Sequence, residues 1–362
     1  MKRPFLYLIL LPLFCVSCNN AVHTVADVLD TFPCTVELNG RDTVIAQLLG
    51  PSDIIVADSL LIIGEPQGNP MISLYDLSGR CLRRFLQKGR GPGETLNLMR
   101  VSLYSPSSIQ VAVDPEAVYV YDIDRLLRGE PLPQREHHFP ADVHAFPSIA
   151  MCSDSMFLYV GKNQDNDSST DMHRFCIRQE ENGIIETFGT YPADDRTIEK
   201  LPADDFSRPT AYQGTAVLSP DRSKAVVTYY YAVGLDILDL PGRRISESVF
   251  YQYPQVESVT IPQLKVQAVR RVPESFRGFL DCCCNNEHIY VLYSAKKFSE
   301  PDYNIGNYIL KYDWTGTPLC VYTLDCPASC FAIDSEETVI YAAVQDENGA
   351  CVVSYDMPAG RI

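Results

Sequence analysis

The chain has 362 residues, of which 46% are hydrophobic, and carries a net charge of −16 at pH 7. This acidic balance excludes a nucleic-acid-binding role, because binding a polyanion requires clustered Lys and Arg, and the chain has no such run. The length allows two domains, although closed all-β folds of this size can form a single unit.

The N-terminus has the pattern of a secretion signal. Met1-Lys2-Arg3 precedes a mostly apolar run over Phe5 to Ser17, which is shorter than the roughly 20 residues that span a bilayer. Ser17-Cys18 resembles the bacterial lipoprotein box, in which a small residue precedes the lipidated cysteine, although Cys15 stands where that box usually has Leu. We predict a signal peptide over residues 1–17. The alternative is a secreted protein without a lipid.

The predicted anchor determines the expected location. Lipid on Cys18 and a tether over residues 18–33 would hold the body at a membrane, and each buried CH₂ contributes about 0.8 kcal/mol. Removing residues 1–17 changes the net charge from −16 to −18, so an anionic membrane surface would repel the body itself. Because no acidic run follows Cys18, we expect an outer-membrane lipoprotein that faces the periplasm rather than the cell surface.

A repeat marks the body of the chain. An aspartate, usually preceded by tyrosine, recurs at the ends of apolar strands, just before a turn. The copies are Tyr75-Asp76, Tyr121-Asp122, Leu238-Asp239, Tyr312-Asp313 and Tyr355-Asp356. A period of about 40 to 50 residues built of short strands is typical of β-propeller blades, and the longest gap leaves room for one degenerate copy. We predict an all-β, six-bladed β-propeller of four-stranded antiparallel blades over residues 34–362.

The strand pattern assigns the blades in chain order. The first five units of four strands are expected over residues 53–86, 99–139, 148–189, 215–253 and 279–324. The sixth, over residues 330–355, has only three strands. The N-terminal segment over residues 34–48 has strand character and no blade of its own, so we expect it to supply the missing strand and close the ring. One short helix is expected over Pro262 to Arg271.

A glycine-rich loop lies between the first two blades. Lys88 to Glu94 reads Lys-Gly-Arg-Gly-Pro-Gly-Glu and is similar to the loop of NHL-like and TolB-like six-bladed propellers. With the lipoprotein box, the chain resembles the TolB-like propeller lipoproteins of anaerobic Gram-negative gut bacteria. The resemblance implies the fold and an envelope location but no substrate. Arg90 and Glu94 are candidate ligand contacts, and the competing interpretation is that the loop only makes a tight turn.

Long insertions are expected on one face of the propeller. Turns between the first and second and between the third and fourth strands of a blade are short. The long connections, over residues 162–171, 191–210, 253–275 and 294–306, belong to the other face, where a binding site is expected. The candidate ligand contacts there are Tyr191, Tyr253, Tyr303 and the histidines His137, His138 and His144. Neutral drift of loop lengths is the alternative.

No metal or cofactor is predicted. Neighbouring residues of a strand point to opposite faces, so Cys282-Cys283-Cys284 cannot converge on one tetrahedral ion. The alternating oxygens of Asp165, Asp167, Ser169 and Asp171 suit calcium, but the segment lacks the glycine and distal glutamate of an EF-hand. The eleven cysteines of the body are an odd number and cannot all pair with one another.

Two functions follow from these features. The first is a monomeric, lipid-anchored, non-enzymatic module that binds an envelope protein, peptide or glycan through the loop-rich face. The alternative is a lyase or hydrolase of a polysaccharide or lactone that uses histidines and carboxylates at the mouth of the central channel.

Overall fold

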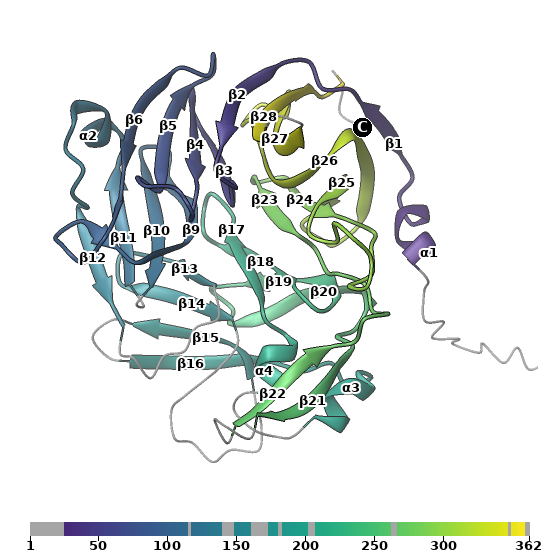
Figure 1. The fold of residues 1–362 in the computed structure, drawn as a ribbon. Coiled ribbons are helices and arrows are strands. Elements are labelled where there is room, and N and C mark those ends of the chain that lie inside the picture. Colours follow the sequence, from purple (N-terminus) through teal and green to yellow (C-terminus); the bar gives the residue numbers. More distant parts are fainter. Residues whose placement is uncertain are drawn as a thin grey trace, which may run out of the picture.

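The computed structural model describes residues 25–114, 117–139, 148–160, 173–179, 183–201, 207–261, 266–346 and 349–358. Small antiparallel sheets surround a central axis (Figure 1), which confirms the all-β propeller architecture. Within each blade, strands that follow one another in the chain pair with one another. The four described helices are short, from five to six residues.

The first three blades are separate four-stranded sheets, close to their expected positions. Their strands are β3 (Asp53–Ala57), β4 (Leu60–Gly64), β5 (Ile72–Asp76) and β6 (Cys81–Phe85); β9 (Asn97–Ser105), β10 (Ser108–Asp114), β11 (Ala117–Asp122) and β12 (Arg135–His138); and β13 (Ile149–Met151), β14 (Met156–Val160), β15 (His173–Gln179) and β16 (Gly183–Thr190).

Blade four is also a separate sheet, whereas blades five and six share one long strand. The strands are β17 (Gly214–Leu218), β18 (Lys224–Tyr229), β19 (Val233–Asp239) and β20 (Arg244–Gln252); then β23 (Asp281–Cys284), β24 (His288–Tyr293), β25 (Gly306–Asp313), β26 (Pro318–Ile333), β27 (Val339–Asp346) and β28 (Gly349–Asp356). The first half of β26 pairs with β25 and the second half with β27, so two strands expected to be separate are one.

The N-terminal segment closes the ring, as predicted. Strand β2 (Thr43–Leu48) pairs antiparallel with β28 and becomes the fourth strand of blade six (Figure 1). Ile45 and Leu48 are buried there, at 4% and 7% exposure. Strand β1 (Thr35–Leu38) adds a further strand to blade five, parallel to β26. Both pairings cover strand edges that would otherwise be open.

Residues expected to belong to a tether also pack on the propeller. Helix α1 (Val25–Asp30) precedes β1, and Val28 is buried within the apolar cluster of blade five. The ring of Phe32 lies edge-on to Tyr312, with 5.1 Å between the ring centroids. The folded body therefore includes residues upstream of Cys34, and Cys18 itself lies outside the described residues.

The tyrosine-aspartate repeat has a structural role. Tyr75, Tyr121, Tyr312 and Tyr355 are at most 4% exposed and fill the blade cores. The carboxylates of Asp76 and Asp313 accept backbone N–H bonds from residues two and four positions later, which closes the turn between the third and fourth strands. Asp122 instead caps helix α2 (Ile123–Arg128) by accepting from the N–H of Arg125 at 2.8 Å.

Helix α2 changes the expected division between the two faces. We call the side that carries the turns between first and second and between third and fourth strands the turn face, and the opposite side the loop face. The β11–β12 connection holds α2 and belongs to the turn face, so the expectation that every long insertion lies on the loop face is wrong. The missed signal was a helix cap: Asp122 begins the helix, and Gly129, with φ +96°, ends it.

The prediction of a short helix over Pro262 to Arg271 is also wrong. Strands β21 (Val256–Ile261) and β22 (Val266–Arg271) form an antiparallel hairpin between blades four and five. The β-branched residues of β21, Val256, Val259, Thr260 and Ile261, favour a strand, and the ion pair between Glu257 and Arg270, at 2.6 Å, joins the two strands of the ribbon. Short helices α3 (Arg196–Lys200) and α4 (Ser207–Ala211) lie instead in the connection between blades three and four.

Candidate functional site: an axial cavity and a cationic aromatic cluster

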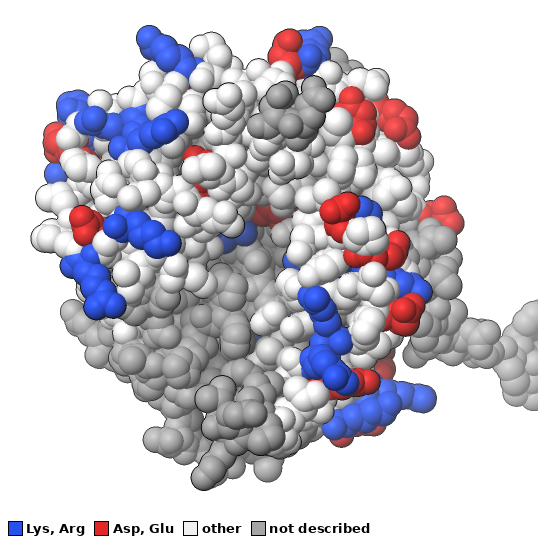
Figure 2. Space-filling model, in the orientation of Figure 1, with Lys and Arg blue, Asp and Glu red and all other residues white. Residues whose placement is uncertain are grey.

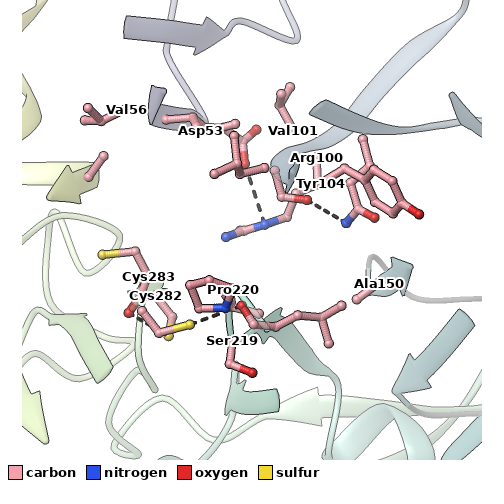
Figure 3. Close-up of a pocket in the computed structure, with 18 of the residues that line it drawn as sticks. Asp53, Val56, Arg100, Val101, Tyr104, Ala150, Ser219, Pro220, Cys282 and Cys283 are labelled. Carbon is pink, nitrogen blue, oxygen red and sulfur yellow. Dashed lines mark hydrogen bonds and ion pairs between the residues drawn. The ribbon is translucent and has the colours of Figure 1, made fainter. Parts of the chain in front are cut away.

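A cavity of about 250 Å³ lies between the first strands of the blades (Figure 3). Strands β3, β9, β13, β17, β23 and the end of β26 all contribute to its wall, and most of the side chains are apolar, such as Val56, Val101 and Ala150. The cavity also reaches the turns that carry Tyr104 and Pro220, which belong to the turn face. It is therefore an axial pocket that extends toward the turn face.

Arg100 crosses the other end of the cavity between two carboxylates. Its Nη2 lies 3.2 Å from Oδ1 of Asp281. Its Nε lies 3.7 Å from Oδ1 of Asp53, the contact between these two labelled residues in Figure 3. The second oxygen of Asp281 accepts the N–H of Phe331 at 3.0 Å. These contacts join blades one, two, five and six at the axis. This charge cluster is part of the wall of the pocket and offers polar groups to an occupant.

Burial controls the ionisation of this cluster. It raises the pKa of Asp53 to about 6, although Arg100 and a hydrogen bond from Ser52 act in the opposite direction. One arginine faces two carboxylates, so the cluster has an excess of negative charge when both are ionised. A titrating carboxyl in a pocket is a common property of binding and catalytic sites.

Asp53→Asn is expected to gain stability relative to wild type as the pH rises from about 4 to about 6. The folded wild type retains a proton that the unfolded chain releases, so wild-type stability falls through this interval, by up to about 3 kcal/mol, and an amide does not titrate. Urea unfolding of both proteins at several pH values measures the difference. Asp239→Asn is the contrasting control, because hydrogen bonds from Gly242 and Arg244 lower the pKa of Asp239. A pH-independent difference for Asp53→Asn would refute this assignment.

The thiols beside the cavity are not suited to nucleophilic chemistry. Burial raises the pKa of Cys284 to about 12 and those of Cys282 and Cys283 well above the usual range, so these thiols stay protonated. No histidine is among the described residues that line the cavity. Carboxylates are therefore present at the channel, as the enzyme alternative required, but His137 and His138 lie elsewhere.

In the glycine-rich loop, the carboxylate of Glu94 bonds to the loop itself. Strands β7 (Gln87–Lys88) and β8 (Glu94–Thr95) pair in parallel, and Glu94 accepts the N–H of Gly91 at 2.7 Å. Glu94 thus holds the loop in shape, which favours the structural interpretation. Arg90 is exposed at the tip of the loop.

The three predicted histidines do not come together among the described residues. His137 is 6% exposed in β12, where its ring packs edge-on to Phe157 at 5.1 Å, so it belongs to the core between blades two and three. His138 is exposed, with its Nε2 3.4 Å from Glu136. His144 lies outside the described residues.

Tyr191 and Tyr253 border a buried network between blades three and four. The ring of Tyr191 lies 5.2 Å from that of Tyr212, and burial raises the pKa of Tyr191. The hydroxyl of Tyr253 donates to Asp194 at 2.7 Å. Both tyrosines are therefore engaged within the protein. Tyr191 packs on Tyr212, whose ring lies 5.2 Å from the guanidinium of Arg174, and Arg174 forms a buried ion pair with Asp236.

Tyr303, one of the predicted ligand contacts, lies in a cluster of arginine and aromatic side chains. We define the cationic aromatic cluster as Tyr230, Arg271, Arg277, Phe298 and Tyr303. The Nη1 of Arg271 donates to the hydroxyl of Tyr303 at 2.8 Å, and its guanidinium lies 5.2 Å from the ring centroid of Phe298. Arg277 stacks on Tyr230 at 3.8 Å, and Tyr230 stacks on Phe298 at 5.5 Å. Hairpin β21–β22 and the β24–β25 loop supply most of these groups on the loop face.

The cations of this cluster lack acidic partners. Within the described chain, no carboxylate forms an ion pair with Arg271 or Arg277; Arg277 donates to backbone carbonyls, including that of Tyr230 at 3.2 Å. Burial lowers the pKa of Arg277 to about 10. Figure 2 shows Lys and Arg side chains to the lower right of the central hollow, with Asp and Glu side chains among them, and further Lys and Arg side chains along the left of the same face. The cluster therefore presents guanidinium groups without ion-pair partners on a strongly acidic protein.

A second, more open groove of about 780 Å³ lies on the turn face between blades five and six. Glu337 accepts from His288 Nδ1 at 2.6 Å and from Lys311 Nζ at 3.1 Å. Burial alone would raise the pKa of Glu337, but hydrogen bonds from His288, Asn285 and Lys311 lower it to about 2. This network fastens blade six to blade five.

The family described as TolB-like 6-blade propeller-like matches residues 42–336. The chain belongs to this TolB-like family. The matched region begins just before β2, contains blades one to five and ends after β26, before β27 and β28 of blade six. It confirms the fold that the glycine-rich loop implied.

Two solved structures are similar to this TolB-like chain over most of its length. A putative exported protein from Bacteroides fragilis has a TM-score of 0.52 and 12% sequence identity, and the match covers 90% of this chain and 99% of that one. The β-propeller domain of Cps50 (Swd1) from Myceliophteria thermophila has a TM-score of 0.47 and 11% identity, over 89% and 100% of the two chains. No curated protein matches. At these identities the likeness concerns the fold.

The described residues also bear on metal binding, on disulfides and on membrane-spanning helices. No three His, Cys, Asp or Glu side chains of that part are placed to hold a metal ion, and Asp165 to Asp171 lie outside it. The eleven body cysteines are all free thiols. None of the described helices has the length and apolar character to cross a bilayer.

Proposed function

We propose that this TolB-like propeller is a lipid-anchored cell-envelope module that binds an anionic partner, a protein, peptide or glycan, through the cationic aromatic cluster. The propeller fold suits such interactions because it presents loops on a rigid ring. Attachment through Cys18 is part of the proposal, and a Cys18→Ser variant that still sedimented with membranes would contradict it.

The observation that carries the proposal is the combination of unneutralised guanidinium groups with stacked aromatic rings. Arginine and tyrosine are enriched at interface positions that contribute most to affinity. A carboxylate can receive two parallel hydrogen bonds from a guanidinium, and the rings offer flat apolar area beside it. Because Arg271 is exposed, its guanidinium is accessible to a partner.

Arg271→Ala is expected to weaken binding to an acidic polymer about 10-fold, equivalent to about 1.4 kcal/mol. The probes are immobilised polygalacturonate and polyglutamate, with neutral dextran as the negative control, and affinity is measured by biolayer interferometry. Raising the salt concentration should weaken wild-type binding, because exposed charges are screened.

The matched control is Arg244→Ala. Arg244 is an exposed arginine that pairs with Asp239 at 2.9 Å in a turn on the opposite, turn face. It should leave affinity unchanged. Equal losses for the two variants, or no binding of either acidic probe by wild type, would contradict the choice of surface.

A further inference from the structure

Cys34 and Cys320 lie side by side where the N-terminal segment joins blade five. In the parallel pair of β1 and β26, Thr35 lies opposite Val321, and the N–H of Val321 donates to the carbonyl of Cys34 at 2.9 Å. The register therefore places Cys34 opposite Cys320. Opposite residues on neighbouring strands have Cα atoms about 4.8 Å apart, which is inside the range found in disulfides, about 4.4 to 6.8 Å.

The two thiols also share one environment. Both are free, Cys320 is fully buried and Cys34 is partly buried, and both pack in the apolar cluster of blades five and six. Burial and then the neighbouring Cys34 thiol raise the pKa of the Cys320 thiol, as expected for two side chains that lie close together. Residues that lie directly opposite each other on neighbouring strands point to the same face of the sheet. The side chains of Cys34 and Cys320 therefore lie on the same face.

We propose that Cys34 and Cys320 form a disulfide that fixes the N-terminal segment to blade five when the protein meets a disulfide oxidant. The thiolate of the more exposed Cys34 attacks one sulfur of the oxidant and releases one thiol. The thiolate of Cys320 then attacks the Cys34 sulfur of this mixed disulfide and releases the second thiol. The two cysteines lose two electrons and two protons, and the oxidant is reduced to two thiols.

The cross-link would stabilise the closed ring. It joins residue 34 to residue 320, so it encloses most of the chain and restricts the unfolded state over that length. It would also secure the segment that contains α1 and Phe32, which connects the propeller to the proposed lipid on Cys18.

The test uses the mature chain treated with glutathione disulfide, alkylated with N-ethylmaleimide, digested and analysed by mass spectrometry. We expect a linked peptide pair containing Cys34 and Cys320, and a rise in Tm of about 5 °C that dithiothreitol reverses. A Cys81→Ser/Cys326→Ser variant, which lacks the two exposed body thiols, should behave like wild type. Cys34→Ser should show neither the link nor the rise.

Peptide mapping of the wild type decides the question even if Cys34→Ser folds poorly. Full alkylation of Cys34 after oxidation would overturn the proposal. So would a link from Cys34 to any other cysteine, or an equal rise in Tm for a folded Cys34→Ser variant.

Discussion

Asp236→Ala is expected to reduce the free energy of unfolding by about 3 to 5 kcal/mol, because it leaves a buried arginine without its counter-ion. The Nη1 of Arg174 in blade three lies 2.5 Å from Oδ2 of Asp236 in blade four, and the two side chains are 3% and 0% exposed. The hydroxyls of Tyr229 and Ser248 also bond to Asp236. Removing the carboxylate therefore breaks one charge pair and two further hydrogen bonds at the same interface.

Urea unfolding followed by tyrosine fluorescence and circular dichroism measures this loss. Asp239→Ala removes the exposed ion pair with Arg244 and should cost less than about 1 kcal/mol. A double variant, Arg174→Met/Asp236→Leu, should recover much of the stability, because it leaves no buried charge unpaired. Similar losses for Asp236→Ala and Asp239→Ala would show that the buried pair has no special importance.

Deleting residues 1–50 is expected to prevent formation of a stable monomer. The deletion removes β1 and β2, exposes the edge of β28, and takes away five buried apolar side chains: Val28, Phe32, Leu38, Ile45 and Leu48. At about 1.5 to 3 kcal/mol each, their burial contributes on the order of 10 kcal/mol, comparable with the whole stability of a typical domain. An open strand edge also favours aggregation.

Size-exclusion chromatography and thermal unfolding test this prediction. The control is deletion of residues 1–24, which leaves α1, β1 and β2 intact and should yield a folded monomer. A cooperative melt and a monomeric elution volume for the longer deletion would mean that the ring closes without its N-terminal strands.

Most of the fold could be predicted from the sequence because strand pairing within a blade is local. The alternation of apolar residues and the turn after each Tyr-Asp pair identified the strands near their observed positions. The three-stranded sixth unit implied that β2 completes it, since an open edge is unfavourable. The errors fell where local pattern is ambiguous: the cap at Asp122, and the hairpin that was taken for a helix.

The candidate site was less predictable. Among the predicted contacts that the structure describes, only Tyr303 belongs to the cationic aromatic cluster, whereas His137 packs on Phe157 and Glu94 holds the glycine-rich loop. Arg271 and Phe298 carried one weak signal, their occurrence in long connections of the loop face. A side chain in a loop has no periodicity that reveals its direction, so its neighbours could not be inferred.

The sequence by itself determined the blades, their order and the strand that closes the ring, because each depends on apolar periodicity and on turns between adjacent segments. Only the tertiary structure decided which charged groups meet. Arg100 and Asp281 are 181 positions apart, yet ring closure brings them to the same axis. Such contacts depend on the closed geometry of all six blades, which no local pattern encodes.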